Sequence, residues 1–280
     1  MKRKALPFAS YEWKIAWRYL RAKRAEGGVS VMTWISLIGI TLAVFALVAT
    51  LSVRSGFRTE IVDTILGSNS HITLYKTLTK DQYGNIDRGF EDYDEVASSL
   101  LSLPGVKRSA PLIRSQIMAT YDNRNIGLEV FGISYKNLLG LERIAKPEQY
   151  SGDINDFENG ISIGSGVARE LGVQVGDKIK LISPNGVRTA FGTSPRVKQF
   201  EIVYIFTAGR YDIDRTRSYL PFSIAQEYFN REGLADEIEV LLDNPSNLTE
   251  AISHIENIVD PNIQLWTWRD ASSSFLRALE

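Results

Sequence analysis

The feature of this sequence that most constrains its fold is an apolar stretch near the N-terminus. No charged residue occurs from Gly27 to Val53, and residues 29–53 read VSVMTWISLIGITLAVFALVATLSV. As a helix rising about 1.5 Å per residue, this segment is roughly 38 Å long, and a bilayer core of ~30 Å needs about 20 apolar residues. A core helix of this length is unusual, and a signal peptide has a shorter apolar region before a small-residue cleavage site, which is not evident before Arg54. The sequence therefore predicts a transmembrane helix over residues 29–53.

The charges on either side of this stretch predict its orientation. Before it, cations outnumber the acids Glu12 and Glu26: Lys2, Arg3, Lys4, Lys14, Arg18, Arg21, Lys23 and Arg24. After it, the charges nearly balance: Arg54 and Arg58 against Glu60 and Asp63. Because Lys and Arg are enriched on the cytoplasmic side of membrane proteins, we expect residues 1–28 in the cytoplasm and the chain after Arg54 on the opposite side.

One face of the predicted membrane helix carries small residues at alternating spacings of three and four: Ser36, Gly39, Ala43, Ala46 and Thr50. The bulkier Leu42 and Phe45 lie on other faces. In lipid, helices associate through close contact between small residues, because apolar bulk gains nothing over lipid tails. We expect this face to pack against another helix; the alternative is chance, since Gly and Ala are common in membrane helices.

Helical periodicity continues on both sides of the apolar stretch. Upstream, apolar residues recur on one face with cations around them: Trp13, Ala16, Trp17 and Leu20. This pattern predicts an amphipathic helix that lies at the cytoplasmic interface or packs on a cytoplasmic protein such as an ATPase subunit. Downstream, helical spacing continues to Gly67 through Val53, Phe57, Ile61 and Ile65. Residues 54–67 are therefore expected to extend the membrane helix as a stalk.

After Ser70 the patterns alternate between strand and helix, which indicates an α+β domain. The strand-like runs are SHITLY, RSQIMATY, IGLEVFGIS, Ile161–Ile163, KIKLI, QFEIVYIF, RSYLPF, EIEVLL and NIQLWTW. The helical runs extend from a cap at Asp92 or Asp94 to Leu103, from a Ser165 cap to Gly172, and over IAQEYFN, LTEAISHIENIV (begun by Pro245) and RDASSSFLRALE. DNRN predicts a hairpin turn, TLTKDQYGNIDRGFE and TAGRYDIDRT predict loops, and Asp177 is expected to order the VGD turn.

The segment ISPNGVRTAFGTSPRVK, Ile182 to Lys198, interrupts this alternation. It joins the runs KIKL and QFEIVYIF, which a two-residue turn could connect. Pro184 and Pro195 frame it, and it contains several cations and no acid. From its residues alone, the segment is either an ordinary surface loop or a projection that contacts a partner.

No residue pattern favours catalysis or metal binding. The chain has no cysteine, which excludes disulfides, zinc-thiolate sites and thiol catalysis, and its net charge of −1 does not favour nucleic acid. GISIG, residues 160–164, matches the G-x-S-x-G nucleophile motif, but isoleucines alternate around Ser162 as in a plain strand, and His254 is the only later histidine. Neither a P-loop nor an H-E-x-x-H motif occurs. We therefore expect no catalytic residue and no metal site.

Three stretches together resemble a known family of membrane proteins. They are the basic amphipathic start, the apolar helix with its continuation to Tyr75, and ISIGSGVARELGVQVGDKIKLISP, residues 161–184. They resemble the permease subunits of the bacterial lipoprotein-releasing ABC transporter, the LolC/LolE type, within the wider MacB/FtsX-like permease family. The resemblance covers nearly the whole chain. It implies an α+β fold in which one N-terminal transmembrane helix with a stalk is followed by a MacB-like periplasmic domain.

The resemblance also implies a domain layout. A porter-like subdomain of β-α-β units, residues 68–133 and 216–268, is expected beside a β-rich inserted subdomain, residues 134–215. Residues 269–280 are expected to begin a second stalk helix. We therefore expect the chain to be the front part of a longer, four-span permease.

The activity that the resemblance implies is mechanical. Such a permease lies in the bacterial inner membrane with its N-terminus in the cytoplasm, extracts lipoproteins and passes them to a periplasmic chaperone of the LolA type. Its other partners are a second permease subunit, identical or not, and a LolD-type ATPase subunit that binds ATP, so no cofactor is expected in this chain. No nucleic acid is involved. The alternative is a MacB/FtsX-like permease that acts in tripartite efflux or in activating cell-wall hydrolases.

The resemblance also gives the segment 183–197 a role. In C-type subunits a protruding β-hairpin, the hook, recruits the chaperone, and this segment falls at the corresponding place. The implied hook residues are Pro184, Asn185, Gly186, Val187, Arg188, Thr189, Ala190, Phe191, Gly192, Thr193, Ser194, Pro195 and Arg196. Val187 and Phe191 are the expected apolar anchors, and Arg188 and Arg196 are expected to meet polar or acidic groups of the partner.

Overall fold

The chain forms two units, Met1–Glu60 and Ile61–Glu280, with the boundary inside helix α2. The structure, a computed structural model, describes residues 10–20, 27–76, 79–80, 86–87, 89–189, 192–245 and 247–271. The helices are α1 (Ser10–Leu20), α2 (Gly27–Ser68), α3 (Tyr93–Leu101), α4 (Tyr135–Leu138), α5 (Glu142–Ala145), η1 (Ile154–Asn159), α6 (Ser165–Leu171), α7 (Tyr211–Thr216), α8 (Phe222–Phe229), α9 (Leu248–Glu256) and α10 (Trp268–Ala271). The strands are β1 (Ile72–Lys76), β2 (Thr79–Lys80), β3 (Ile86–Asp87), β4 (Val106–Tyr121), β5 (Arg124–Ile133), β6 (Gln149–Gly152), β7 (Ile161–Gly164), β8 (Lys178–Thr189), β9 (Gly192–Thr207), β10 (Arg217–Pro221), β11 (Glu237–Leu242) and β12 (Ile263–Thr267).

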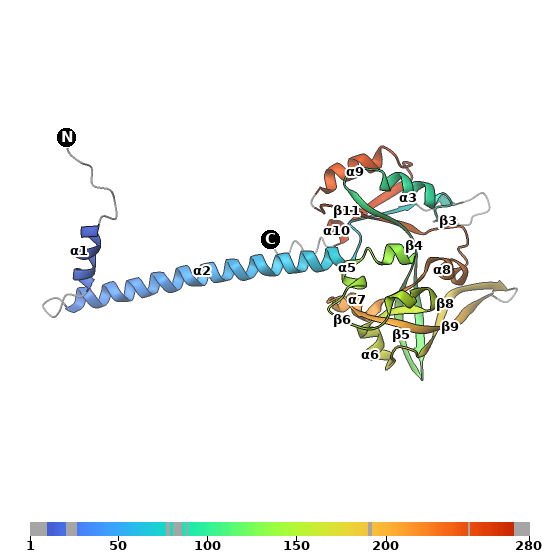
Figure 1. Cartoon of the computed structure of the whole chain (residues 1–280), viewed down its shortest axis with the longest axis horizontal. Helices are drawn as coiled ribbons and strands as arrows, with labels where there is room; N and C mark the ends of the chain where they lie inside the picture. The colour runs from blue at the N-terminus through green and yellow to red at the C-terminus, as the bar shows by residue number, and fades with distance from the viewer. Residues whose placement is uncertain are drawn as a thin grey trace. The chain divides into compact units, whose positions relative to one another are not determined.

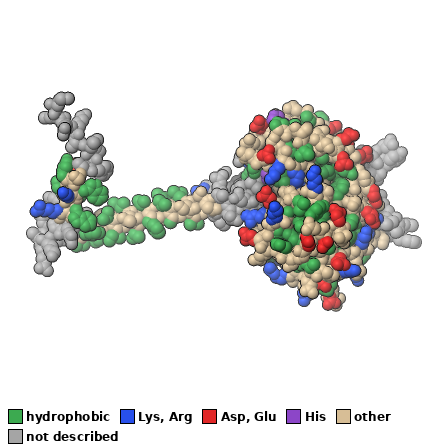
Figure 2. Space-filling model, in the orientation of Figure 1, with side chains coloured by type: hydrophobic (Ala, Val, Ile, Leu, Met, Phe, Trp, Pro, Cys, Tyr) green, Lys and Arg blue, Asp and Glu red, His purple; other side chains and the backbone are tan. Residues whose placement is uncertain are grey.

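The first unit contains α1 and most of α2. The helix predicted around Trp13 and Trp17 is confirmed as α1, and both indole side chains are exposed. Helix α2 is continuous, so the apolar stretch and the expected stalk form one helix. Its segment Val31–Gly56 is exposed and is the only helical stretch among the described residues that is long and apolar enough to cross a membrane. Figure 2 shows hydrophobic side chains along this segment.

A four-stranded antiparallel sheet, in the order β12-β1-β11-β4, forms one part of the second unit. Helices α3 and α9 pack on the same face of it (Figure 1). The connections β1-α3-β4 and β11-α9-β12 are two β-α-β units whose strands alternate in the sheet. Apolar side chains of both layers form their core, among them Leu74, Leu100, Val240 and Ile255.

Strand β4 is long enough to serve two sheets. Its first part, Val106–Leu112, pairs with β11 in the four-stranded sheet. Its second part, Ile113–Tyr121, pairs with β5, and residues 118–120 also pair with β8. A single strand therefore joins the two parts of the second unit without a linker.

Six strands, β4 among them, close into a ring. Successive pairings run β4-β5-β10-β7-β9-β8 and return from β8 to β4, with β5–β10 and β7–β9 parallel. Alternate residues of these strands, with apolar residues of α6 and α8, fill a common core that includes Ile117, Leu128, Ile163, Leu181 and Phe200. The ring takes β4, β5 and β10 from the expected porter-like segments and β7, β8 and β9 from the expected insertion. The division into subdomains stays a prediction.

Aromatic residues form a further core between the ring and the short elements α4, α5, η1 and α7. The ring centroid of Tyr219 lies 5.7 Å from that of Phe131 and 5.6 Å from that of Phe206. Tyr204 donates its hydroxyl to the carbonyl oxygen of Ile144, and burial raises the pKa of Tyr204 to about 12, so the hydroxyl keeps its proton. The buried Tyr204 ring with its bonded hydroxyl thus fixes α5 against β9.

Several local predictions are confirmed. The DNRN turn joins β4 to β5 in a hairpin, and Asp122 and Asn123 both have positive φ, as a tight two-residue turn requires. Gly172 ends α6 with a φ of 73°, in the left-handed region. The Asp177 carboxylate accepts a hydrogen bond from the backbone N–H of Gln174 at 2.8 Å, which orders the turn before β8. The α+β fold class with an N-terminal apolar helix is confirmed.

The predicted helix caps were wrong in detail. Gly164, not Ser165, is the N-cap of α6. A side chain does not fit at Gly164, because a Cβ there would lie 2.3 Å from the carbonyl oxygen of Asp214 in α7. Asp92 occupies the N-cap of α3, but its side chain makes no capping bond and lies 3.7 Å from the Lys76 ammonium. Helix α9 begins at Leu248, later than the predicted start at Pro245.

Two segments predicted as loops contain regular structure. The polar run after β1 forms a short hairpin of β2 and β3. The run TAGRYDIDRT contains α7, because the Asp214 carboxylate accepts hydrogen bonds from the backbone of Ala208 and Gly209 and folds the chain back on itself. Within this run Arg210 pairs with Asp212, at 2.5 Å, whereas Arg215 pairs with Glu170 of α6.

Candidate partner-binding site

The segment Ile182–Lys198 is part of a β-hairpin formed by β8 and β9. The strands pair from Lys178↔Glu201 to Thr189↔Gly192, so the hairpin extends well past the six-strand ring. The resemblance predicted a hairpin here, and the described residues form one. Its turn, Ala190 and Phe191, lies outside the described residues, as do the side chains of Asn185, Gly186, Val187, Arg188, Thr189, Gly192 and Thr193. The anchoring roles expected for Val187, Phe191 and Arg188 stay predictions.

A bulge separates the outer part of the hairpin from its base. Ser183 pairs with Arg196, and the next pair is Val187 with Ser194, so β8 carries two extra residues there. Pro184 lies at the start of this bulge and has no backbone N–H to give to a ladder. Because a bulge bends its strand, β8 changes direction at Pro184, where the hairpin leaves the ring.

Arg196 links the hairpin base to helix α8. Its Nη1 donates to the carbonyl oxygens of Glu227 and Tyr228, at 2.6 and 3.1 Å, in the last turn of α8. Tyr228 donates its hydroxyl back to the Arg196 carbonyl oxygen at 3.2 Å, and burial raises the pKa of Tyr228 to about 12. A cation suits a helix C-terminus, where the last carbonyls are unpaired. Whether Arg196 also contacts a partner stays a prediction.

An apolar groove of about 570 Å³ lies beside the hairpin base. Three of the residues that line it are cross-strand neighbours on the outer face of β5, β4 and β8: Gly127, Met118 and Ile182. Val197 of β9 pairs with Ile182 and continues this row beyond the groove. Met118 is 43% exposed and Val197 56% exposed, and a Cβ at Gly127 would meet nothing within 4 Å. Pro184 and Pro195 line the same groove and are exposed. The hairpin base thus presents a flexible methionine and apolar neighbours to solvent.

Sequence reasoning missed Met118 and Val197. They are 79 positions apart in the sequence and fall in one row, with Ile182 between them, only through the β4–β8 and β8–β9 registers. The alternation of inward and outward side chains along β4 was the available signal. Ile117 and Ala119 are buried and polar residues flank them, so Met118, which lies between them, falls on the outer face of the strand.

The small-residue face of α2 is exposed along its whole length. Ser36, Gly39, Ala43, Ala46 and Thr50 are all exposed, and a Cβ at Gly39 would meet nothing within 4 Å. The Thr50 hydroxyl donates to the Ala46 carbonyl oxygen at 2.8 Å, which satisfies it inside lipid. Packing of this face against another helix stays a prediction.

The geometry does not form a nucleophile at GISIG. Ser162 lies inside strand β7, is fully buried and pairs with Tyr219 of β10. The motif requires a serine at a sharp, open turn between strand and helix. Substrate therefore has no access to this hydroxyl.

Known proteins similar to this chain match it over both the apolar helix α2 and the domain that follows it. Residues 33–258 match the family described as MacB-like periplasmic core domain. The chain is 29% identical to the lipoprotein-releasing system transmembrane protein LolC of Neisseria meningitidis, over 97% of this chain and 64% of that protein. It is 28% identical to LolC of Xylella fastidiosa strain Temecula1, over 79% of this chain and 51% of that protein. It is also 28% identical to LolE of Haemophilus influenzae, over 82% of this chain and 55% of that protein.

These relatives are longer than the chain, which spans about half to two-thirds of their length. Among solved structures, the periplasmic region of MacB from Actinobacillus actinomycetemcomitans aligns with a TM-score of 0.48 and 10% identity, over 76% of this chain and 95% of that one. Helix α2 and the names of the relatives identify a membrane protein. Because the family match covers most of the chain, the chain belongs to the MacB-like periplasmic core domain family, and its resemblance to the LolC/LolE-type permeases is confirmed.

Proposed function

We propose that this chain is the N-terminal part of an ABC transporter permease that releases lipoproteins from the inner membrane to a periplasmic chaperone. The observation that carries the proposal is the extent of the similarity to LolC, which covers 97% of the chain and thus includes α2, the ring and the β8–β9 hairpin. A relative that shared only the MacB-like domain would support the family but not this cargo. No observation favours the efflux or cell-wall alternatives.

In this proposal α2 carries motion across the membrane. Its N-terminus lies in the cytoplasm, where α1 contacts a LolD-type ATPase subunit that binds and hydrolyses ATP. The face from Ser36 to Thr50 packs against a helix of a second permease subunit, and ATP-driven closure slides one helix along the other. A continuous helix suits this role because it has no break to absorb the movement.

The β8–β9 hairpin is the chaperone-recruiting element in this proposal. The exposed edges of a hairpin leave backbone groups free to pair with an incoming strand. Val187 and Phe191 anchor the outer part, and Arg188 meets polar or acidic groups of the LolA-type chaperone. The apolar groove with Met118 at its base adds a second contact area, while Arg196 keeps the base fixed on α8.

Depletion of the protein in its own cells tests the proposal. Outer-membrane lipoproteins are expected to accumulate in the inner membrane, and the wild-type gene is expected to restore their sorting. A variant with Glu232→Gln, an exposed change at a residue that belongs to neither the hairpin nor α2, is a control that should also restore sorting. Normal lipoprotein distribution after depletion, with drug sensitivity or a division defect instead, would replace this proposal by the efflux or cell-wall alternative.

A further inference from the structure

The hairpin base, residues 181–183 of β8 and 196–198 of β9, turns one face toward helix α8. Arg196 and Lys198 lie on this face, because residues two apart in a strand point the same way, and both contact the last turn of α8. Val197, between the two cations, points to the opposite face and is exposed. The base of the hairpin is therefore open to solvent on one face and supported by a helix on the other.

The last turn of α8 attracts the two cations. It contains no basic residue and carries Glu227, although the end of a helix already has partial negative charge on its last carbonyl groups. Arg196 donates to the carbonyl oxygens of Glu227 and Tyr228, and the Lys198 ammonium lies 3.3 Å from Oε1 of Glu227. Tyr228 donates its hydroxyl back to the Arg196 carbonyl oxygen. Polar contacts thus run in both directions between α8 and β9.

Helix α8 is itself held firmly against the ring. Ala225 and Tyr228 are buried, and a Cβ at Gly132 of β5 would lie 2.2 Å from the Cβ of Ala225, so helix and strand are in very close contact. The Tyr228 ring also meets Phe200 of β9 edge-on, with ring centroids 5.5 Å apart. Because closely packed elements resist displacement, α8 can serve as a fixed support for β9.

Beyond its base the hairpin has little to fix its direction. Among the residues that the structure describes, β8 is the only strand that pairs with β9 before Ile202. Directly after the Ser183↔Arg196 pair the ladder is interrupted by the bulge in β8. Pro184 and Pro195 lie at this interruption, and neither has a backbone N–H for the ladder. The contacts with α8 are therefore the last fixed points before the hairpin projects.

Arg196 makes the stronger of the two cation contacts. The side chains of Lys198 and Glu227 are 42% and 68% exposed, and an exposed ion pair of this kind contributes little. The guanidinium of Arg196 instead reaches two carbonyl oxygens, one of them part-buried, through charge-assisted hydrogen bonds. Arg196 is therefore the main link between the hairpin and α8.

We propose that Arg196 is a positioning residue: by joining β9 to the last turn of α8, it fixes the direction in which the hairpin projects and so prepares the hairpin for its partner. This inference rests on the proposed role of the hairpin in capturing a LolA-type chaperone. Its physical basis is preorganisation, because a segment that already has its bound orientation loses less conformational freedom on binding. Arg196 then raises the affinity without touching the chaperone.

The test restores the link to α8 by a second route. In the full-length protein, Arg196→Ala is expected to weaken binding of the purified LolA-type chaperone about fivefold, through loss of preorganisation. Lys198→Cys and Glu227→Cys are then added to this variant, and a short bifunctional maleimide joins the two thiols; the chain contains no cysteine of its own. The crosslink is expected to return binding to within about twofold of the wild type. A direct contact between Arg196 and the chaperone could not be restored in this way.

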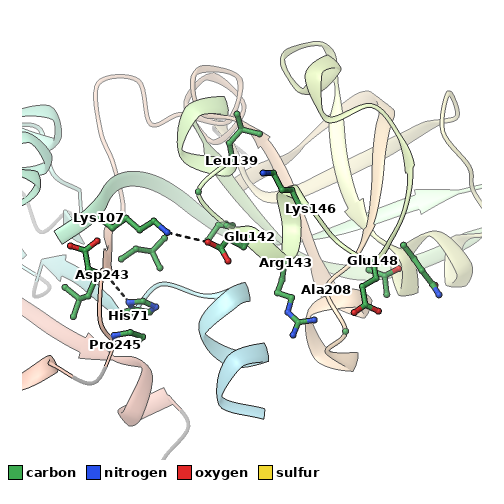
Figure 3. Close-up of a pocket in the computed structure, with 17 residues that line it drawn as sticks. His71, Lys107, Leu139, Glu142, Arg143, Lys146, Glu148, Ala208, Asp243 and Pro245 are labelled. Atoms are coloured by element: carbon green, nitrogen blue, oxygen red, sulfur yellow. Dashed lines mark hydrogen bonds and ion pairs between the residues drawn. The ribbon is translucent and has the colours of Figure 1, made fainter. Parts of the chain in front are cut away.

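A matched crosslink elsewhere in the second unit is the control. Lys107 and Glu142 form another exposed Lys–Glu pair, 3.4 Å apart. Figure 3 shows this pair beside a cavity of about 1090 Å³ whose described lining includes no residue of the hairpin base or of α8. Lys107→Cys and Glu142→Cys, crosslinked in the Arg196→Ala protein, should leave chaperone binding weak.

Hydrogen exchange measures the link without any chaperone. The backbone amides of residues 192–198 are expected to exchange faster in Arg196→Ala, because β9 is no longer held on α8. They should slow again after the crosslink between positions 198 and 227, but not after the control crosslink.

The outcomes distinguish this inference from the proposed function. Recovery of both binding and slow exchange with the crosslink to α8 supports the positioning role. Recovery of slow exchange without binding means that Arg196 touches the chaperone itself, which overturns the inference and leaves the proposed function standing. Unchanged exchange in Arg196→Ala, or equal recovery with the control crosslink, also overturns it. A wild-type protein that binds no LolA-type chaperone contradicts the proposed function, and this inference with it.

Discussion

Arg217 donates from Nη1 to Oδ1 of Asn69 at 2.9 Å, joining strand β10 to the residue that directly follows helix α2. The guanidinium of Arg217 also lies 4.6 Å from the centroid of the Phe131 ring, and that of Arg114 lies 5.3 Å from the same centroid. The position just after α2 is therefore fixed to the ring by a charged hydrogen bond and by packing of the guanidinium on an aromatic side chain.

Loss of the Arg217 contacts with Asn69 and Phe131 should destabilise the second unit. Arg217→Ala is expected to lower the free energy of unfolding by about 2 kcal/mol, because it removes a part-buried charged hydrogen bond and a cation–π contact. Arg215→Ala, which breaks an exposed pair with Glu170, should cost less than about 1 kcal/mol. Thermal unfolding of both variants in detergent, against the wild type, measures the difference. Equal melting temperatures for the two variants would show that the Arg217 contacts with Asn69 and Phe131 do not stabilise the protein.

The two arginines of the hairpin should behave differently. Arg196→Ala removes two hydrogen bonds to the end of α8 and should cost about 1.5–3 kcal/mol. Arg188→Ala should leave stability within about 0.5 kcal/mol, as for an ordinary surface change. Hydrogen exchange of the β8–β9 backbone amides reports on the base directly. If these amides still exchange slowly in Arg196→Ala, the bonds from Arg196 to α8 do not stabilise the hairpin base.

Glu237 should make stability depend on pH. Burial, opposed by Arg114 and reinforced by Glu239 and Asp236, raises the pKa of Glu237 from 4.5 to about 7. The folded state therefore holds this proton more tightly than the unfolded state. The stability that the proton contributes is fully present below pH 4.5 and is lost as pH rises to about 7.

Glu237→Gln cannot ionise and should remove this loss. Relative to the wild type, the variant is expected to gain stability between pH 4.5 and 7, on the order of 3 kcal/mol, and then level off. Chemical unfolding at several pH values measures the gain. His71, whose lowered pKa acts in the opposite direction, is present in both proteins and cancels in the difference. A difference that stays constant with pH would mean that Glu237 keeps an ordinary pKa.

The apolar helix and the local strands could be predicted from sequence, because each rests on a nearby signal. The length of the uncharged stretch is enough to predict the membrane segment, and the pattern of apolar residues is enough to predict strands such as β11. The ring could not be predicted, because it depends on pairings such as β5 with β10 that join residues far apart in the chain. For the same reason, the sequence could not show that Arg196 donates to the last carbonyls of α8 or that Met118 and Val197 share a row across β4, β8 and β9.

The small-residue face of α2 should be found beside a neighbouring helix in the membrane. A photoreactive phenylalanine analogue at Ala43 is expected to crosslink a permease subunit, because close helix contact occurs at small residues. The same analogue at Phe45, on another face, should crosslink much less. Equal crosslinking at both positions would remove the packing role of this face.

The most direct test of the central claim is capture of the chaperone by the hairpin. The full-length protein would be compared with a variant in which residues 184–195 are replaced by a two-residue Asn-Gly turn, so that β8 and β9 stay joined at the Ser183↔Arg196 pair. The account predicts that the variant assembles with its ATPase subunit and hydrolyses ATP but neither retains the LolA-type chaperone nor releases lipoprotein to it. Undiminished chaperone capture and lipoprotein release by the shortened hairpin would contradict the account.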